Sequence, residues 1–231
     1  MLEIWNFLLD LVFPKFCIDC GREGDWLCQG CQKEILPVKT QVCPGCGIIS
    51  QNGKYCRKHR KPHGLSGIVV AAYYEEGPIK ELIHNFKYNH ILELKEILGG
   101  LLVKVLKDNF DVMKGKVIIT AVPLHYLRKS QRGFNQSELL AGAVADKLKL
   151  QKNFNILKKI RYTKPQVKFS GKIRRKNLQN SFEFNKKFNI LGRTIILVDD
   201  VTTTGTTLNE CAKVLREAGA RKVWGLVVAK G

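Results

Sequence analysis

The chain has 231 residues and carries 39 Lys and Arg against 20 Asp and Glu, a formal net charge of +19. Its length accommodates one good-sized domain with a smaller appendage and a core large enough to fold unaided. No apolar run approaches the roughly 18 residues of a membrane-spanning helix, which excludes that class of protein. The positive charge favours polyanionic partners such as nucleic acid, although an anionic small substrate also accounts for it.

Residues 1–13 form a short apolar segment that includes Glu3 and Asp10. The segment lacks the basic start and the small-residue cleavage site of a secretory signal peptide. It therefore predicts an amphipathic helix that packs on the protein itself, with docking to a partner or a membrane surface as the alternative. We expect a cytoplasmic protein, and the sequence leaves open whether this helix contacts the inner face of the membrane.

Seven of the eight cysteines fall within residues 17–56. With one histidine they form four pairs, each separated by two residues: Cys17 and Cys20, Cys28 and Cys31, Cys43 and Cys46, Cys56 and His59. Eight thiolate and imidazole ligands are the number that two tetrahedral Zn²⁺ sites require, and all positions are filled, as in structural sites.

Disulfide bonds and an iron–sulfur centre are the alternatives to zinc. Disulfides need an oxidising compartment that this sequence gives no sign of entering, and four evenly paired knuckles fit an iron–sulfur centre less well. In a sequential arrangement, two consecutive pairs would bind the same ion. In a cross-braced arrangement, alternate pairs would bind the same ion. The spacing alone does not decide between these two arrangements.

A polar bridge with Pro and Gly at residues 57–64 predicts a domain boundary, with an N-terminal helix and double zinc ribbon at 1–63 and a second domain at 64–231. Strands and helices alternate after it. We expect strands near 67–74, 116–122, 156–160, 194–198 and 222–228, and helices near 77–88, 92–108, 134–149 and 206–218. Continuously apolar strands that alternate with helices predict an α/β fold, with a parallel sheet covered on both faces.

A long polar loop is expected at residues 123–133, after the strand at 116–122. Its Arg128, Lys129 and Arg132 are suited to a diphosphate, for which arginine offers bidentate geometry. An ordinary solvent-exposed loop with incidental charge is the alternative. Farther along, residues 151–193 hold thirteen Lys and Arg and a single acid, Glu183.

The most specific stretch is 194–208, in which an apolar strand ends in Asp199 and Asp200 and a Thr/Gly loop then opens a helix. Open α/β sheets bind ligands at the carboxyl ends of their strands. Two carboxylates can accept hydrogen bonds from ribose hydroxyls, and loop amides at a helix N-terminus can surround a phosphate. A buried strand with a capped helix is the alternative, and a Walker loop fits worse because Gly-Lys-Thr/Ser is absent.

The pattern Asp-Asp-Val-x-x-Thr-Gly-x-Thr matches Asp199 to Thr207 without a gap and resembles the phosphoribosyl pyrophosphate (PRPP) loop of type I phosphoribosyltransferases. Together with the cysteine pairs, Val-Pro-Leu at 122–124, Arg-Gly-Phe-Asn-Gln at 132–136 and the basic segment, the chain resembles the ComF (ComFC) competence family over essentially its whole length. It departs from the family in His59, where a cysteine is usual, and in Gln166-Val-Lys-Phe, where Gln-Thr-Gly-Leu is commoner.

This resemblance implies a Rossmann-like parallel sheet of the type I phosphoribosyltransferase kind that binds PRPP with Mg²⁺. The positions that match the family's ribose and 5-phosphate site are Asp199, Asp200, Val201, Thr202, Thr203, Thr204, Gly205, Thr206 and Thr207. The positions that match its pyrophosphate-side loop are Val122, Pro123, Leu124, Arg128 and Arg132, and Lys87 matches a lysine after the first helix. A flexible loop that closes over the ligand would include Lys164, Gln166, Arg174 and Arg175.

The resemblance also implies a role in natural transformation, in which the protein handles incoming single-stranded DNA, with a competence helicase or a DNA-uptake channel as a further partner. The alternative is an active phosphoribosyltransferase outside competence that transfers ribose 5-phosphate from PRPP to an unknown nitrogen acceptor. A zinc-ribbon adaptor with an inert pocket is the third hypothesis. The sequence does not identify the acceptor or the oligomeric state.

Overall fold

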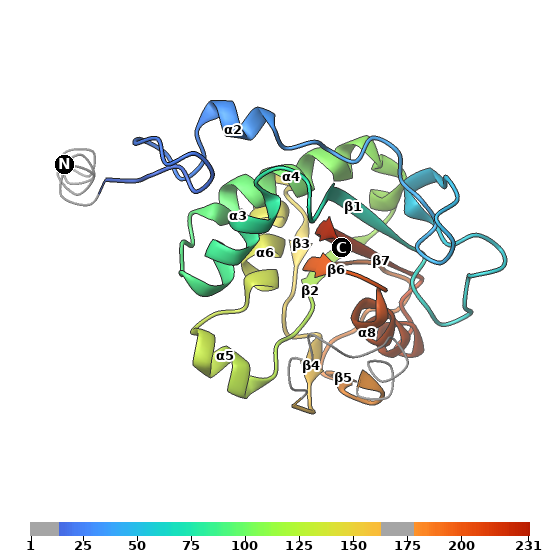
Figure 1. Cartoon of the computed structure of the whole chain (residues 1–231). Helices are drawn as coiled ribbons and strands as arrows, with labels where there is room; N and C mark the ends of the chain where they lie inside the picture. Colours follow the sequence, from blue (N-terminus) through green and yellow to red (C-terminus); the bar gives the residue numbers. More distant parts are fainter. Residues whose placement is uncertain (1–13, 163–177) are drawn as a thin grey trace.

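The computed structural model describes residues 14–162 and 178–231, and its centre is a five-stranded parallel sheet in the order β1-β7-β6-β2-β3 (Figure 1). The strands are β1 (Gly67–Tyr73), β2 (Val117–Ala121), β3 (Gln151–Lys152), β6 (Thr194–Thr202) and β7 (Lys222–Lys230). The helices are α2 (Gln29–Lys33), α3 (Ile79–Tyr88), α4 (Leu94–Asp108), α5 (Tyr126–Arg132), α6 (Gln136–Leu148) and α8 (Thr206–Glu217), with 3₁₀ turns η1 (Gln51–Gly53) and η2 (Phe110–Met113). The predicted α/β class is confirmed.

The strands β1, β2, β6 and β7 are largely buried on both faces, and successive residues of each contribute to opposite faces. In β6, Ile196 and Val198 belong to a core that includes residues of α3, α4 and α6, whereas Ile195 and Leu197 belong to a second core with α8. This two-sided burial explains why the central strands are continuously apolar in sequence.

Three local predictions differ from the structure. The expected polar loop at 123–133 contains the short helix α5, whose residues are all at least partly exposed, so no apolar periodicity signals it. The strand β6 continues through Asp199 and Asp200 to Thr202 instead of ending at the acids. The strand expected near 156–160 is β4 (Leu157–Lys159), which pairs antiparallel with β5 (Phe182–Phe184) outside the main sheet.

The cysteine-containing segment, residues 17–59, passes around the edge of the sheet at β1 (Figure 1). Its first part, with Cys17, Leu27 and Cys31, packs into the core on the α3, α4 and α6 side. Its later part, with Val38 and Tyr55, packs against the core on the α8 side. The cysteine-containing segment therefore contacts the layers on both sides of the sheet. The boundary between residues 63 and 64 stays a prediction.

The outer edge of β1, which no other strand of the described sheet pairs with, is hydrogen-bonded by the cysteine-containing segment. The side-chain amide of Gln41 donates to the carbonyl of Val70 at 2.9 Å and accepts from its N–H at 3.0 Å, as a neighbouring strand would. The backbone N–H of Val38 donates to the carbonyl of Ala71 at 2.9 Å. Unpaired edge groups promote aggregation, so this cover protects the sheet. Within the described residues, no helix is long and apolar enough to cross a bilayer.

We predict that Gln41→Ala destabilises the protein, because Gln41 is only 6% exposed and its loss leaves the N–H and carbonyl of Val70 without their partner. The expected loss is about 2 kcal/mol in the free energy of unfolding, measured by denaturant titration of the zinc-loaded protein. Gln51→Ala is the matched control, because Gln51 makes an exposed hydrogen bond to Asp111. Equal stabilities of the two variants would contradict the role of Gln41.

Candidate functional site

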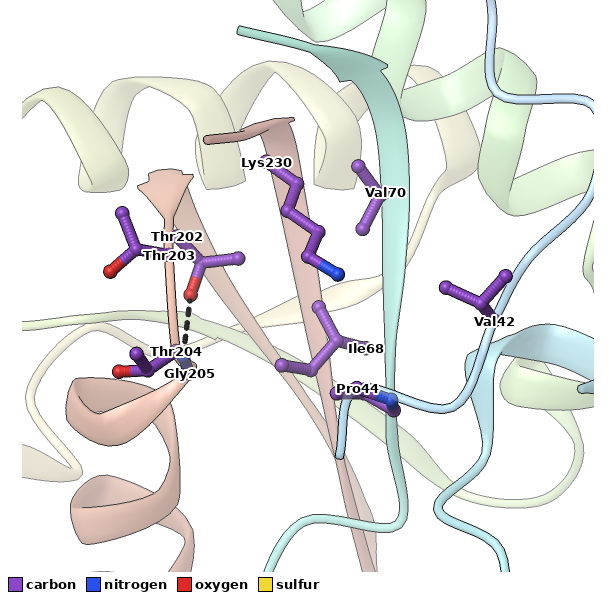
Figure 2. A pocket seen from close by; sticks show the side chains of 9 residues that line it. All are labelled: Val42, Pro44, Ile68, Val70, Thr202, Thr203, Thr204, Gly205 and Lys230. Carbon is purple, nitrogen blue, oxygen red and sulfur yellow. Dashed lines mark hydrogen bonds between the residues drawn. The ribbon is translucent and has the colours of Figure 1, made fainter. Parts of the chain in front are cut away.

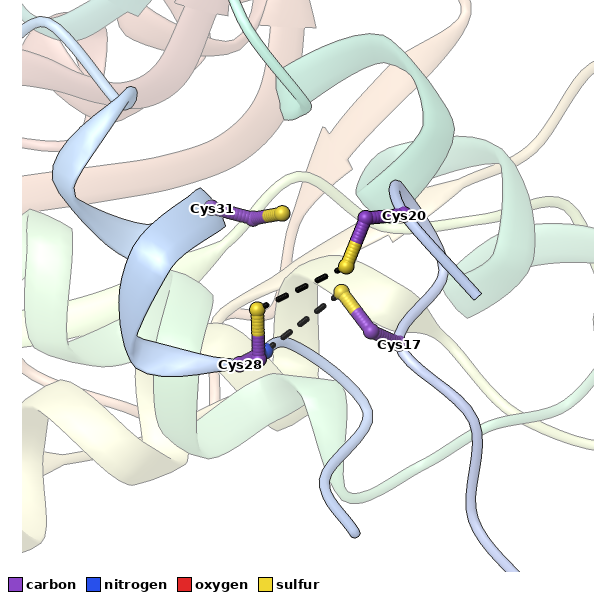
Figure 3. Close-up of side chains that lie close together, drawn as sticks. All are labelled: Cys17, Cys20, Cys28 and Cys31. Atoms are coloured by element: carbon purple, nitrogen blue, oxygen red, sulfur yellow. Dashed lines mark hydrogen bonds between the residues drawn. The ribbon is translucent and has the colours of Figure 1, made fainter. Parts of the chain in front are cut away.

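Eight predicted ligands gather into two clusters in which all ligand atoms lie within 4.8 Å of one another. The first consists of Cys17, Cys20, Cys28 and Cys31 (Figure 3), and the second of Cys43, Cys46, Cys56 and His59. Consecutive pairs therefore share a site, so the arrangement is sequential and the cross-braced alternative is wrong. Four soft ligands without an open position fit structural Zn²⁺.

Backbone N–H groups support the thiolate form in both clusters. The N–H of Cys28 donates to Cys17 Sγ at 3.4 Å, and the N–H of Cys56 donates to Cys43 Sγ at 3.3 Å. Burial raises the pKa of Cys17, but backbone donors including this one outweigh it and lower that pKa to about 6. The same competition lowers the pKa of Cys43 to about 7. Thiolates are the form that binds the metal, so these backbone donors favour metal binding at Cys17 and Cys43. In each cluster a neighbouring thiol, Cys31 or Cys46, has a raised pKa instead.

The two adjacent carboxylates of β6 occupy different environments. Asp200 is only 4% exposed, and its Oδ2 lies 2.8 Å from Lys87 Nζ at the end of α3. Asp199 is half-buried and accepts at Oδ1 from Ser137 Oγ (2.9 Å) and from the N–H of Asp200 (3.0 Å). Burial first, and then the charge of Asp200, raise the pKa of Asp199 to about 7.

Lys87 is the cation that balances this acid pair. Burial disfavours its charged form, but the carboxylates of Asp200 and Asp199 outweigh burial and raise the pKa of Lys87. Lys87 therefore stays charged, and its ion pair offsets the cost of the buried Asp200. The family resemblance singled out this lysine, and the structure brings it into contact with the acid pair.

The Thr/Gly loop after β6 is held in a tight turn at the start of α8. Gly205 has a φ of 70° in the left-handed region, and its N–H donates to Thr202 Oγ1 at 3.1 Å. The hydroxyls of Thr204 and Thr206 lie 2.7 Å apart. A twelve-residue helix begins at Thr206, so the loop lies at the positive end of its dipole.

A basic pocket of about 680 Å³ opens next to Lys87. It is lined by Lys87, Tyr88, His90, Arg128, Gln131 and Arg132. The Arg132 guanidinium lies 5.3 Å from the centre of the Tyr88 ring, and its Nη1 donates to Gln136 Oε1 at 2.7 Å. The predicted cations Arg128 and Arg132 thus share one cavity with the lysine that pairs with Asp200.

Residues 122–124 of the predicted pyrophosphate-side loop start beside the acid pair. The N–H of Val122 donates to the carbonyl of Val198, the residue before Asp199, at 2.9 Å. The side-chain amide of Asn135 donates to the carbonyl of Val122 at 3.1 Å and so links this loop to the start of α6. The flexible-loop residues Lys164, Gln166, Arg174 and Arg175 lie outside the described residues.

Sequence reasoning missed three residues around the site. Ser137 contacts Asp199 and directly follows the motif Arg132 to Gln136, which was a usable signal. Lys159 on β4 lies with its Nζ 5.6 Å from the centre of the Phe182 ring, and burial followed by the charge of Arg128 lowers its pKa. Asn209 on α8 bonds to the carbonyl of Gly205. Neither Lys159 nor Asn209 carried a signal in the sequence.

Two family models match the chain. A phosphoribosyl transferase domain matches residues 135–230, and a double zinc ribbon domain matches residues 8–59. The first range contains the acid pair and the Thr/Gly loop, and the second contains all eight ligands of the two clusters.

Curated relatives match almost end to end. Competence protein F of Haemophilus influenzae is 34% identical over 246 residues, which cover 99% of this chain and 100% of the relative. DNA utilization protein YhgH of Escherichia coli K12 is 33% identical over 94% of this chain and 98% of its own. Competence protein ComFC of Streptococcus pneumoniae is 27% identical over 90% of this chain and 84% of its own.

We predict that Asp199→Asn changes the pH dependence of stability. The folded protein retains a proton on Asp199 up to about pH 7, whereas the ordinary pKa of the group is 3.8. The folded state therefore binds more protons between these values, so this carboxyl group makes stability fall as the pH rises from about 4 to about 7, and the loss levels off above the folded-state pKa. The variant should therefore gain stability relative to wild type as the pH rises from 5.5 to about 7, and the difference should level off by pH 8.

Thermal unfolding of both proteins across this range would test the prediction. The exposed Asp146, which pairs with Lys152, supplies the control variant Asp146→Asn. Its stability difference from wild type should not follow the same titration. Parallel curves for wild type and Asp199→Asn would contradict the raised pKa.

Proposed function

The chain belongs to the family of Competence protein F, and from this premise we propose that it binds PRPP at the carboxyl end of β6 and handles single-stranded DNA during DNA uptake. The observation that carries the proposal is the acid pair Asp199–Asp200, beside Lys87 and directly before the Thr/Gly loop of α8. The two carboxylates can accept hydrogen bonds from the two ribose hydroxyls, and the backbone amides of the loop can bind the phosphate. These two kinds of group match the two ends of ribose 5-phosphate.

In this proposal each group has one task. Asp199 and Asp200 accept hydrogen bonds from the ribose hydroxyls, and residues 203–207 surround the 5-phosphate. The pyrophosphate-side loop at 122–124 and the basic pocket with Arg128 and Arg132 receive the diphosphate. Positive side chains there would also stabilise charge on a departing diphosphate. Mg²⁺ would supply further charge neutralisation, held mainly by the oxygens of the diphosphate and by water.

Turnover is a separate proposal from binding. An active phosphoribosyltransferase needs a nitrogen acceptor next to C1 of the ribose, and no described residue identifies that acceptor. The complete acid pair and the basic pocket favour a functional transferase over an inert pocket. Release of pyrophosphate on addition of an acceptor would therefore support the enzyme within the same site.

A role in DNA handling is supported by charge and by the relatives. One relative is named a DNA utilization protein, and two others are named competence proteins. Beside the α8 layer, β4, β5 and the turn after β5 expose several cations, among them Lys158, Lys186 and Lys187. We propose that this surface, named here the β4–β5 surface, contacts the phosphates of a single strand.

PRPP with Mg²⁺ should bind wild type in calorimetric titration, and Asp199→Asn/Asp200→Asn should abolish measurable binding because both ribose contacts are weakened. The control Asp108→Asn/Asp146→Asn removes two exposed carboxylates and should bind like wild type. No binding to folded, zinc-loaded wild type would reject the PRPP site. Equal binding by both double variants would reject the assignment of the acid pair.

Fluorescence anisotropy with a labelled single-stranded oligonucleotide should show affinity that falls steeply with salt, because counterion release dominates. Lys158→Ala/Lys187→Ala should flatten the plot of log affinity against log salt by about 1 unit of slope. Lys104→Ala/Lys107→Ala removes the same charge from the exposed side of α4 and is the control. Equal decreases in this slope in the two variants would contradict DNA binding at the β4–β5 surface.

A further inference from the structure

A chain of hydrogen bonds joins the second ligand cluster, which contains Cys43, Cys46, Cys56 and His59, to the Thr/Gly loop. The side-chain amide of Asn209, in the first turns of α8, donates to the Tyr55 hydroxyl at 3.0 Å and to the carbonyl of Gly205 at 3.1 Å. Its oxygen accepts from the N–H of Leu65 at 3.4 Å. Asn209 therefore uses both donors and its acceptor to hold three parts of the chain together.

Tyr55 is adjacent in sequence to a ligand of the second cluster. It precedes the ligand Cys56, whose N–H donates to Sγ of the ligand Cys43. The N–H of Tyr55 itself donates to the carbonyl of Ser66 at 3.1 Å, next to the start of β1. The position of the Tyr55 ring thus depends on the geometry of the second cluster.

The cluster and the loop also face each other across a pocket of about 280 Å³ (Figure 2). Val42 and Pro44, on either side of the ligand Cys43, line one wall. Residues Thr202 to Gly205 line another, with Ile68 between them. The hydrogen bonds of Tyr55 and Asn209 join the same two parts of the chain and so link the position of the cluster to the loop.

Gly205 is the residue on which this link acts. Its N–H is held by Thr202, and its carbonyl accepts from both the backbone N–H (2.9 Å) and the side chain of Asn209. Its backbone is left-handed, and a Cβ there would lie 2.9 Å from Ile68 Cδ1. Both backbone polar groups of Gly205 are therefore hydrogen-bonded. These bonds fix the peptide planes on either side of Gly205, and with them the direction of the backbone N–H groups that would face an anion.

We propose that Tyr55 and Asn209 are positioning residues for the Thr/Gly loop, through which metal at the second cluster strengthens phosphate binding. This inference rests on the proposed function, because it assumes that the loop binds the 5-phosphate of PRPP. It assigns the second cluster a task beyond stabilising the fold. The first cluster, on the opposite face of the sheet, has no such link among the described residues.

The first test compares Tyr55→Phe with Tyr73→Phe, which removes an exposed hydroxyl from β1. Tyr55→Phe should weaken PRPP binding in calorimetry by roughly 3- to 10-fold, the effect of losing one hydrogen bond, without changing zinc content. Amides of residues 203–209 should exchange hydrogen faster in the ligand-free protein. Tyr73→Phe should match wild type in both measurements.

A double variant separates positioning from a general loss of packing. If the two residues act through one link, Tyr55→Phe/Asn209→Ala should bind PRPP no more weakly than Asn209→Ala alone. Additive losses, accompanied by additive decreases in Tm, would mean that each residue only stabilises the fold and would overturn the proposal.

A matched pair of ligand variants tests the role of the metal. Cys20 and Cys46 are the exposed ligands at equivalent positions of the first and second clusters. Cys46→Ser should accelerate exchange at residues 203–209 and weaken PRPP binding at least 3-fold more than Cys20→Ser. Equal effects of the two variants would overturn the inference.

The two proposals fail in different ways. If wild type binds PRPP but Tyr55→Phe resembles Tyr73→Phe in affinity and exchange, the link is wrong and the proposed function stands. If wild type does not bind PRPP, the proposed function is wrong and exchange alone decides on the link. Faster loop exchange in both Tyr55→Phe and Cys46→Ser then supports it, and unchanged exchange overturns it.

Discussion

The free edge of β1 is the constraint on which the arrangement of the molecule depends. The outer side of an edge strand exposes backbone N–H and carbonyl groups that water or another segment has to hydrogen-bond. Here Gln41 and Val38 hydrogen-bond that edge, so the cysteine-containing segment has to pass along it. One metal cluster consequently packs on the α3, α4 and α6 side, and the other comes to lie beside the loop that begins α8.

Electrostatics at the carboxyl end of β6 follow from burial of two adjacent acids. Asp200 is stabilised by Lys87. Asp199 accepts hydrogen bonds from Ser137 and a backbone N–H that lower its pKa, but burial and the charge of Asp200 outweigh them, so its pKa is raised. Arg128 and Arg132 line one cavity nearby, together with Lys87. The site thus combines acceptors for hydroxyls with cations for phosphates, which are the complementary chemistries of a phosphorylated sugar.

Hydrophobic pattern accounts for most of the main sheet and its helices. The strands β1, β2, β6 and β7 are buried on both faces and read as apolar runs, and α3, α4, α6 and α8 were expected within a few residues of their bounds. Exposed elements left no such pattern. The helix α5 has no buried residue and begins at a side-chain cap from His125. The strand β3 consists of two residues, both exposed. Neither element therefore produces a hydrophobic periodicity in the sequence.

The sequence by itself determined the eight metal ligands and the order of acids, loop and helix from Asp199 to Thr207, because both depend on short spacings along the chain. Only the tertiary structure decided which cysteine pairs share a site and which residues contact the acids and the loop. Lys87 is more than one hundred positions from Asp200, and Tyr55 lies 154 positions from Asn209. Such contacts arise from sheet order and packing, which local spacing does not encode.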